Sequence, residues 1–207
     1  MIAVTIAFGD AYIRLAELAA ASVRSMTGLE THVLQDAHGA AVPVYVKLRL
    51  LELFPGQRVL YFDADTRFVR PWDPAAVSGR FAAVLDKSSN ERDADCRRYG
   101  IDKARYFNSG LWIAGPECSL AFRWAWDLVH KPGYKTGFKY EQTALNAGIQ
   151  RYAVAVDLLD RRYNAICSPE TPPPPDAVVL HCAGGTLHGR NRAIWEKAIR
   201  DAETTTP

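Results

Sequence analysis

The chain has 207 residues, with 25 Lys and Arg against 23 Asp and Glu, so its formal net charge is +2. Hydrophobic residues make up 48% and charged residues 23% of the chain, which are the proportions of a globular protein and exclude a disordered one. The near balance of charge argues against a nucleic-acid partner, because duplex binders carry a strong basic excess. The length predicts one domain over residues 1–207, with two small domains as the alternative.

Four cysteines are present, and none forms a C-x-x-C pair; the nearest two, Cys167 and Cys182, are 15 positions apart. This usage excludes a zinc-finger spacing and a disulfide scaffold, so we expect a cytoplasmic protein. The apolar start, residues 1–8, has no basic flank and is cut short by Gly9 and Asp10. It predicts a buried strand rather than a signal peptide or a transmembrane segment, and it leaves peripheral membrane contact open.

Short apolar runs alternate with helical patterns along the chain. In chain order, the expected elements are strand 2–8, helix 12–23, strand 31–34, helix 46–54, strand 58–62, strand 81–85, strand 107–114, helix 120–130, helix 140–147, strand 152–156, strand 178–181 and helix 192–202. The charge-dense stretch 88–103 and the proline-rich stretch 168–176 are expected to be loops. The alternation predicts an α/β fold, a mixed and mostly parallel sheet with helices on both faces.

Two carboxylates follow the apolar run of residues 59–62, in the order Asp63-Ala64-Asp65. In an extended backbone, side chains at i and i+2 point the same way and lie about 6.6 Å apart. Two such acids repel each other unless a cation lies between them. The end of a strand is also where open α/β sheets bind ligands. The pattern therefore predicts a divalent-cation site, with a simple turn cap as the alternative.

An acid pair after a buried strand fits two enzyme classes. One is a nucleotide-sugar transferase of the GT-A fold, in which the acids hold a metal on the diphosphate. The other is a haloacid-dehalogenase-type, Mg²⁺-dependent phosphatase, in which the first acid is a nucleophile. The phosphatase motif normally belongs to the first strand, and it has a small residue and then Thr after the second acid. Here two expected strands come before the acids, and Thr66 and Arg67 follow them. This favours the transferase.

Four segments in the same order resemble glycosyltransferase family 8, whose members are retaining, metal-dependent enzymes of the GT-A fold. They cover most of the chain: Tyr61 to Asp65 with the continuation Val69 to Asp73, then Phe107 to Ile113 (Phe-Asn-Ser-Gly-Leu-Trp-Ile), Glu141 to Asn146 (Glu-Gln-Thr-Ala-Leu-Asn), and His181 to Gly184 (His-Cys-Ala-Gly). Lys47 stands where the family has a basic residue. The chain departs from the family in having Glu141 where an Asp is usual, and in lacking a lysine after the last segment.

The resemblance implies a set of roles. His181 becomes a third metal ligand beside Asp63 and Asp65, and an imidazole with carboxylates suits Mn²⁺ better than Ca²⁺, with Mg²⁺ as a second choice. Glu141 and Gln142 lie under the anomeric carbon as catalytic residues; Glu141 is the better nucleophile, because Gln142 is neutral. The donor-binding residues are expected to be Phe8, Asp10, Tyr12, Lys47, Asp86, Asn108, Ser109, Gly184, His188 and Arg190.

Several of these residues also have simpler explanations. Tyr12 is expected to stack on uracil, or else to pack at the start of its helix. Asn108 and Ser109 interrupt an apolar strand, so they either bond locally or face the sugar. His188, Arg190 or Arg192 is left to replace the missing lysine on the diphosphate. Gly184 lets a backbone amide approach a phosphate, or simply forms a turn.

The sequence therefore predicts a GT-A-like glycosyltransferase that moves a hexose from a nucleotide sugar, with UDP expected, to a saccharide, lipid-linked or protein acceptor, with retention and with Mn²⁺. The phosphatase and a non-catalytic nucleotide-sugar-binding domain remain alternatives. No residue identifies the donor sugar or the acceptor.

Overall fold

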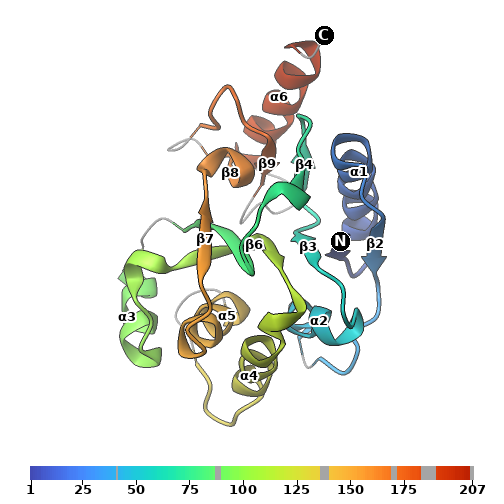
Figure 1. The fold of residues 1–207 in the computed structure, drawn as a ribbon. Helices are drawn as coiled ribbons and strands as arrows, with labels where there is room; N and C mark the ends of the chain where they lie inside the picture. The colour runs from blue at the N-terminus through green and yellow to red at the C-terminus, as the bar shows by residue number, and fades with distance from the viewer. Residues whose placement is uncertain (41, 87–89, 136–139, 169–171, 183–189, 206–207) are drawn as a thin grey trace. The chain divides into compact units, whose positions relative to one another are not determined.

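The computed structural model describes residues 1–40, 42–86, 90–135, 140–168, 172–182 and 190–205 (Figure 1). The chain divides into two compact units, and each is assembled from separate segments. The first unit consists of Met1–Gln35, Leu60–Val77 and Asp160–Pro207. The second unit consists of Asp36–Val59 and Ser78–Leu159.

In the first unit, strands lie side by side in the orders β2-β1-β3 and β4-β9-β8. Strands β1 and β2 are parallel, as are β8 and β9, whereas β4 and β9 are antiparallel. Helix α1 contacts β1, β2 and β4. The elements that lie wholly or almost wholly in this unit are β1 (Ile2–Ile6), α1 (Asp10–Thr27), β2 (Thr31–Leu34), β3 (Val59–Phe62), β4 (Thr66–Phe68), η2 (Pro74–Ala76), η5 (Arg161–Asn164), β8 (Ala165–Ile166), β9 (Val179–His181) and α6 (Arg190–Thr205).

In the second unit, the strand order is β6-β5-β7, with β5 antiparallel to β6 and parallel to β7. Helices α4 and α5 lie side by side (Figure 1). The elements of this unit are η1 (Pro43–Arg49), α2 (Leu50–Leu53), β5 (Phe81–Leu85), α3 (Asn90–Tyr99), η3 (Lys103–Arg105), β6 (Phe107–Ala114), η4 (Pro116–Cys118), α4 (Ser119–Val129), α5 (Tyr140–Arg151) and β7 (Val156–Leu159).

The core of the second unit is built on aromatic side chains. Phe81, Phe107, Trp112 and Phe122 are almost fully buried, and their ring centroids lie 4.8 to 6.3 Å apart. Tilted and edge-on pairs at such distances add to the burial of apolar area. This cluster ties β5 and β6 to α4, and it holds the strands that carry polar residues at their ends.

Helix α5 packs unusually closely against α4. A Cβ atom added at Gly148 would lie 2.4 Å from the carbonyl oxygen of Ala121, so only glycine permits this approach. Nearly every described side chain in the first two turns of α5 is buried. A helix buried on all sides provides a rigid base for the polar residues at its start.

The expected fold class, α/β with mostly parallel strands and helices, is confirmed, but some element boundaries were wrong. The range 46–54 was expected to be one helix and is instead the 3₁₀ helix η1 followed by the short α2. The strand expected at 152–156 is displaced to β7 because a turn comes first, with Ala153 at φ 49°. Helix α3 lies within the expected loop 88–103; its sequence has no apolar periodicity, so the pattern gave no helical signal.

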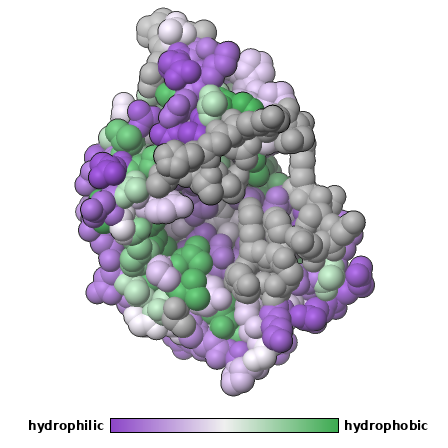
Figure 2. All heavy atoms as spheres, turned by 180° about the vertical axis from the view of Figure 1, so that it is seen from behind, coloured by the Kyte–Doolittle hydropathy of each residue, from purple (hydrophilic) through white to green (hydrophobic). Residues whose placement is uncertain are grey.

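Figure 2 shows one face of the molecule, on which apolar side chains occur in small groups between hydrophilic ones. Within the described residues, no helix is both long and apolar enough to cross a membrane.

Candidate active site

The two aspartates lie in a tight turn between β3 and β4. The backbone N–H of Thr66 donates to the carbonyl of Asp63 (3.1 Å), which closes a four-residue turn, and the Thr66 hydroxyl donates to the same oxygen (2.8 Å). The expectation of an extended backbone through both acids was therefore wrong. The turn, rather than strand alternation, brings the carboxylates to one side. The Tyr61 hydroxyl donates to Asp63 Oδ1 (2.6 Å) and orients that side chain.

His181 comes to the same place through strand register. Thr66 of β4 pairs directly with His181 of β9, and the backbone N–H of Cys182 donates to the carbonyl of Asp65 (3.0 Å). His181 Nε2 lies 3.7 Å from Asp63 Oδ2 and 3.4 Å from Asp65 Oδ1. The imidazole is 3% exposed, whereas the carboxylates are 29% and 21% exposed. The histidine side of the site is therefore buried, and the carboxylate side is open to solvent.

Asn164, at the end of η5, fixes the orientation of the imidazole. Its side-chain oxygen lies 2.7 Å from His181 Nδ1. Because an amide oxygen only accepts, Nδ1 donates to Asn164, and Nε2 is the ring nitrogen that faces the carboxylates. Metal-bound histidines are commonly held by such a partner on the other ring nitrogen. Asn164 is thus an orienting residue that the sequence did not reveal.

We expect replacement of Asn164 by Ala to weaken Mn²⁺ binding about 10- to 100-fold, because the imidazole loses the acceptor that sets its tautomer and angle. Titration calorimetry of Mn²⁺ in the presence of UDP measures the change. Asn164→Asp keeps an oxygen acceptor and serves as the matched variant that retains binding. Equal affinities for the Ala variant and the unmodified chain would contradict the orienting role.

The donor set of this cluster fits a divalent cation. One ligand atom from each of Asp63, Asp65 and His181 lies within 4.8 Å of the other two. Without a cation, the two carboxylates of Asp63 and Asp65 lie close together and repel each other. Two carboxylates and one imidazole suit a first-row ion such as Mn²⁺. The residues that would hold the ion are therefore the three expected from the sequence.

The loop after β1 lies beside the acid turn. Ala64, between the two aspartates, packs in one cluster with Ala7 and Ala16, and Ile13 covers the cluster. The donor-binding candidates Phe8, Asp10 and Tyr12 come shortly after the end of β1. Phe8 is half-buried, Asp10 begins α1 and is exposed, and Tyr12 is 44% exposed. The exposed Tyr12 ring is available for stacking.

A second polar cluster is buried in the second unit, at the start of α5. Lys47 Nζ of η1 donates to Glu141 Oε1 (3.1 Å), and their side chains are 1% and 11% exposed. The hydroxyl of Ser109 on β6 donates to the same oxygen (3.2 Å). Charge pairs this deeply buried are retained only where the partners satisfy each other. Lys47, expected on phosphate or sugar, is here the partner of Glu141.

Gln142 connects the same cluster to β5. Its Oε1 accepts from the backbone N–H of Ser109 (3.0 Å), and its Nε2 donates to Asp86 Oδ2 (2.6 Å). A register shift between Ala83 and Leu85 precedes Asp86, and bulges of this kind redirect side chains next to active sites. Gln142 is fully buried. Its amide therefore has a fixed orientation, and the carboxylate of Asp86 is held at the strand end.

The two polar residues inside β6 were expected either to bond locally or to face a sugar. Asn108 Oδ1 accepts from the backbone N–H of Gly110 (2.8 Å), and Ser109 binds Glu141 and Gln142. The local bond accounts for the burial of Asn108 in part, and the bonds of Ser109 place it within the second polar cluster.

Three candidates are not placed. Gly184 and His188 lie outside the described residues. Arg190 begins α6, and its side chain is not described. Of the cations offered in place of the missing lysine, Arg192 is the one described, and it bonds Glu196 (2.6 Å) and lies over the Trp195 ring. The diphosphate contact therefore stays a prediction.

No protein-family model matches the sequence, and no curated protein matches it. Solved structures do match. A galactosyltransferase, LgtC, in complex with donor and acceptor sugar analogues, is 20% identical, with a TM-score of 0.68, over 100% of this chain and 97% of LgtC. The apo form of the bifunctional glycosyltransferase WbbM is 14% identical, with a TM-score of 0.70, over 96% of this chain and 49% of WbbM.

A third structure, the apo form of the glycosyltransferase GlyE from Streptococcus pneumoniae, is 16% identical, with a TM-score of 0.63, over 98% of this chain and 61% of GlyE. At these identities the likeness establishes the fold. The expected GT-A fold is confirmed.

Proposed function

We propose that this chain is a metal-dependent glycosyltransferase that moves a hexose from a UDP-sugar to a saccharide, lipid-linked or protein acceptor, with retention. The observation that carries the proposal is the convergence of Asp63, Asp65 and His181, in a fold shared with glycosyltransferases. A single GT-A domain over residues 1–207 is part of this proposal.

In the proposed site, Asp63, Asp65 and His181 would hold Mn²⁺, which would supply Lewis-acid stabilisation of the negative charge on the leaving diphosphate. Phe8, Asp10 and Tyr12 take the base and ribose, because their loop lies against the acid turn. Gly184, His188 and Arg190 are proposed to complete the diphosphate grip.

The second polar cluster takes the sugar in this proposal. Glu141 and Gln142 are the catalytic residues, and Asp86, Asn108 and Ser109 meet the sugar hydroxyls. An anomeric centre that loses its leaving group becomes positive, as in other glycosyl transfers. The carboxylates of Glu141 and Asp86 are the groups suited to stabilise that charge. Lys47 and Ser109 hold Glu141 Oε1 in place.

The phosphatase alternative finds less support. A nucleophilic aspartate of that type normally belongs to the first strand, whereas Asp63 follows the third strand of the chain. One ligand atom from each of Asp63, Asp65 and His181 lies within 4.8 Å of the other two, which suits shared coordination better than separate nucleophile and acid roles.

The proposal is tested by thermal unfolding with UDP, with and without Mn²⁺. We expect UDP to stabilise the protein only when Mn²⁺ is present, by about 2.7 kcal/mol at 100 times its dissociation constant. Release of UDP from UDP-glucose or UDP-galactose separates an enzyme from a binding domain. Stabilisation without any UDP release would favour the binding domain, and no stabilisation would reject the metal-dependent transferase.

The cysteines support a reducing compartment, and we propose the cytoplasm. All four cysteines are buried and free. Burial raises the pKa of Cys118 and of Cys182 to about 11, and that of Cys167 to about 12. Thiols in this state remain protonated and unreactive, so they serve as core residues.

A further inference from the structure

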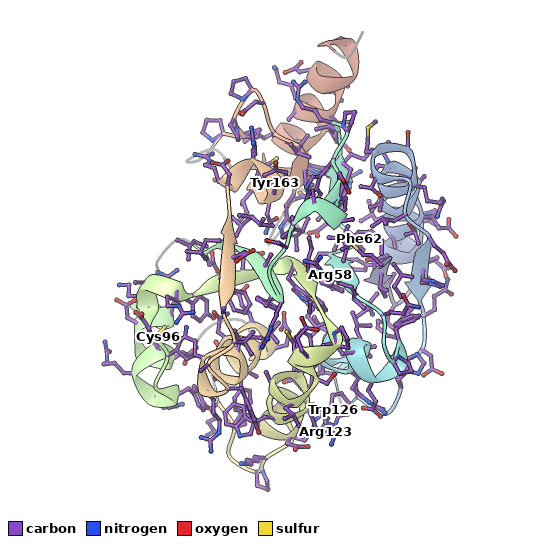
Figure 3. All side chains as sticks on the ribbon, viewed as in Figure 1. Arg58, Phe62, Cys96, Arg123, Trp126 and Tyr163 are labelled. Carbon is purple, nitrogen blue, oxygen red and sulfur yellow. The ribbon has the colours of Figure 1, made fainter. Side chains whose placement is uncertain are left out.

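Helix α3 buries charged side chains on the face that it turns to the protein. Arg92 and Asp95 are each 2% exposed, and Cys96, the residue of this helix that Figure 3 labels, is 4% exposed. Their spacing of i, i+3 and i+4 places them on one face of the helix. Burial of a guanidinium is costly unless its bonds are satisfied. The contacts of Arg92 therefore indicate what this charge does.

Arg92 contacts two residues at the ends of neighbouring strands. Its Nη1 donates to the backbone carbonyl of Asp86, and its guanidinium lies over the ring of Tyr106, 5.3 Å from the centroid. The backbone N–H of Asp86 donates to the carbonyl of Tyr106 (2.9 Å). One guanidinium thus supports both residues of this backbone pair, through a charge-assisted hydrogen bond and a cation–π contact.

Asp86 and Tyr106 in turn hold two consecutive residues of α5. Asp86 Oδ2 accepts from Gln142 Nε2 (2.6 Å), and the Tyr106 hydroxyl lies 3.0 Å from Thr143 Oγ1. Burial raises the pKa of Tyr106 to about 12, so its hydroxyl stays protonated and keeps this bond at neutral pH. Two separate chains of contacts therefore run from Arg92 to the first turn of α5.

We propose that Arg92 is a positioning residue, which acts through Asp86 and Tyr106 to hold the Gln142 amide in the orientation required at the reacting sugar. The inference rests on the proposed function for the role of Gln142. The proposed role of Arg92 includes no contact between this residue and the nucleotide. Loss of Arg92 therefore lowers turnover of the donor without weakening the binding of UDP.

The variants for the test are Arg92→Ala, Arg92→Lys and, as the matched control, Arg97→Ala. Arg97 lies on the same helix and is exposed, so its removal changes the charge equally without touching Asp86. Arg92→Lys keeps the positive charge but lacks the planar guanidinium group with its several N–H donors. It provides a folded comparison if the Ala variant is unstable.

The first measurement is the exchange with water of the Gln142 side-chain amide protons by NMR, with the signal assigned through Gln142→Leu. In Arg92→Ala we expect exchange to accelerate about 10- to 100-fold, the change that corresponds to loss of one charge-assisted hydrogen bond. Arg92→Lys is expected to fall between, and Arg97→Ala to match the unmodified chain. An unchanged Gln142 signal in a folded Arg92→Ala variant overturns the inference.

The second measurement is UDP release from UDP-glucose and UDP-galactose. We expect kcat to fall about 10- to 100-fold in Arg92→Ala, with the Kd of UDP in Mn²⁺ unchanged and with partial recovery on addition of guanidinium. Equal loss of kcat and UDP affinity, without rescue, indicates a purely structural role and rejects the inference. If the unmodified chain neither binds UDP with Mn²⁺ nor releases it, the proposed function fails, while the Gln142 signal still decides the role of Arg92.

Discussion

Asp65→Asn is expected to abolish the Mn²⁺-dependent binding of UDP while the protein stays folded. The substitution removes a negative ligand from the cluster of Asp63, Asp65 and His181. Loss of a residue that only orients a ligand typically costs 10- to 100-fold in metal affinity, so loss of the ligand itself is expected to cost at least about 100-fold. Fold is expected to persist because the bond of Asp65 to Cys182 uses the backbone carbonyl.

Titration calorimetry of UDP at saturating Mn²⁺ measures this loss, and circular dichroism checks the fold. Asp201→Asn is the matched control, because it makes the same change of charge at an exposed position of α6, where the Asp201 carboxylate accepts from Lys197 (2.6 Å). Undiminished UDP affinity in Asp65→Asn would remove the metal site from the proposal.

Lys47→Met is expected to be the most destabilising of the single substitutions considered. It leaves the carboxylate of Glu141 buried beside Ser109 without its cation. Breaking one side of a buried ion pair costs about 3–5 kcal/mol of unfolding free energy. The double variant Lys47→Met with Glu141→Gln removes the orphaned charge and leaves an oxygen acceptor for Ser109. We therefore expect it to recover most of the loss.

Urea unfolding of the single and double variants measures the pair. Lys103→Met tests an ion pair of similar geometry at the surface, since Lys103 Nζ lies 2.7 Å from Asp93 Oδ2 and is 48% exposed. That variant is expected to unfold almost as the unmodified chain does, because exposed pairs contribute little. A double variant no more stable than Lys47→Met would show that the charge of Glu141 is not the source of the cost.

Most strands could be predicted from the sequence, because their residues are apolar and turns lie at both ends of each apolar run. β3, β5 and β6 lie where apolar runs were expected. It did not predict β4, whose three residues, Thr66–Phe68, include only one apolar side chain. Such a strand forms because β9 pairs with it, and that pairing depends on residues more than a hundred positions away.

The residues of the candidate site were likewise predictable only in part. Asp63, Asp65 and His181 were identified from strand ends and from the resemblance, and the structure places them together. Asn164 and Arg92 were not identified as site residues, because each acts on a partner that is close only in the folded chain. The pairing of Lys47 with Glu141 spans 94 positions. Local patterns contain no signal for contacts of this kind.

The segmented first unit has a consequence for the order in which the protein gains its properties during synthesis. Asp63 and Asp65 emerge early from the ribosome, but Asn164, β8 and β9 belong to the last segment, Asp160–Pro207. A nascent chain that stops before this segment has the acid turn without the strand that pairs with Thr66 and without His181. The proposed set of three metal ligands is therefore complete only after the segment Asp160–Pro207 has been synthesised.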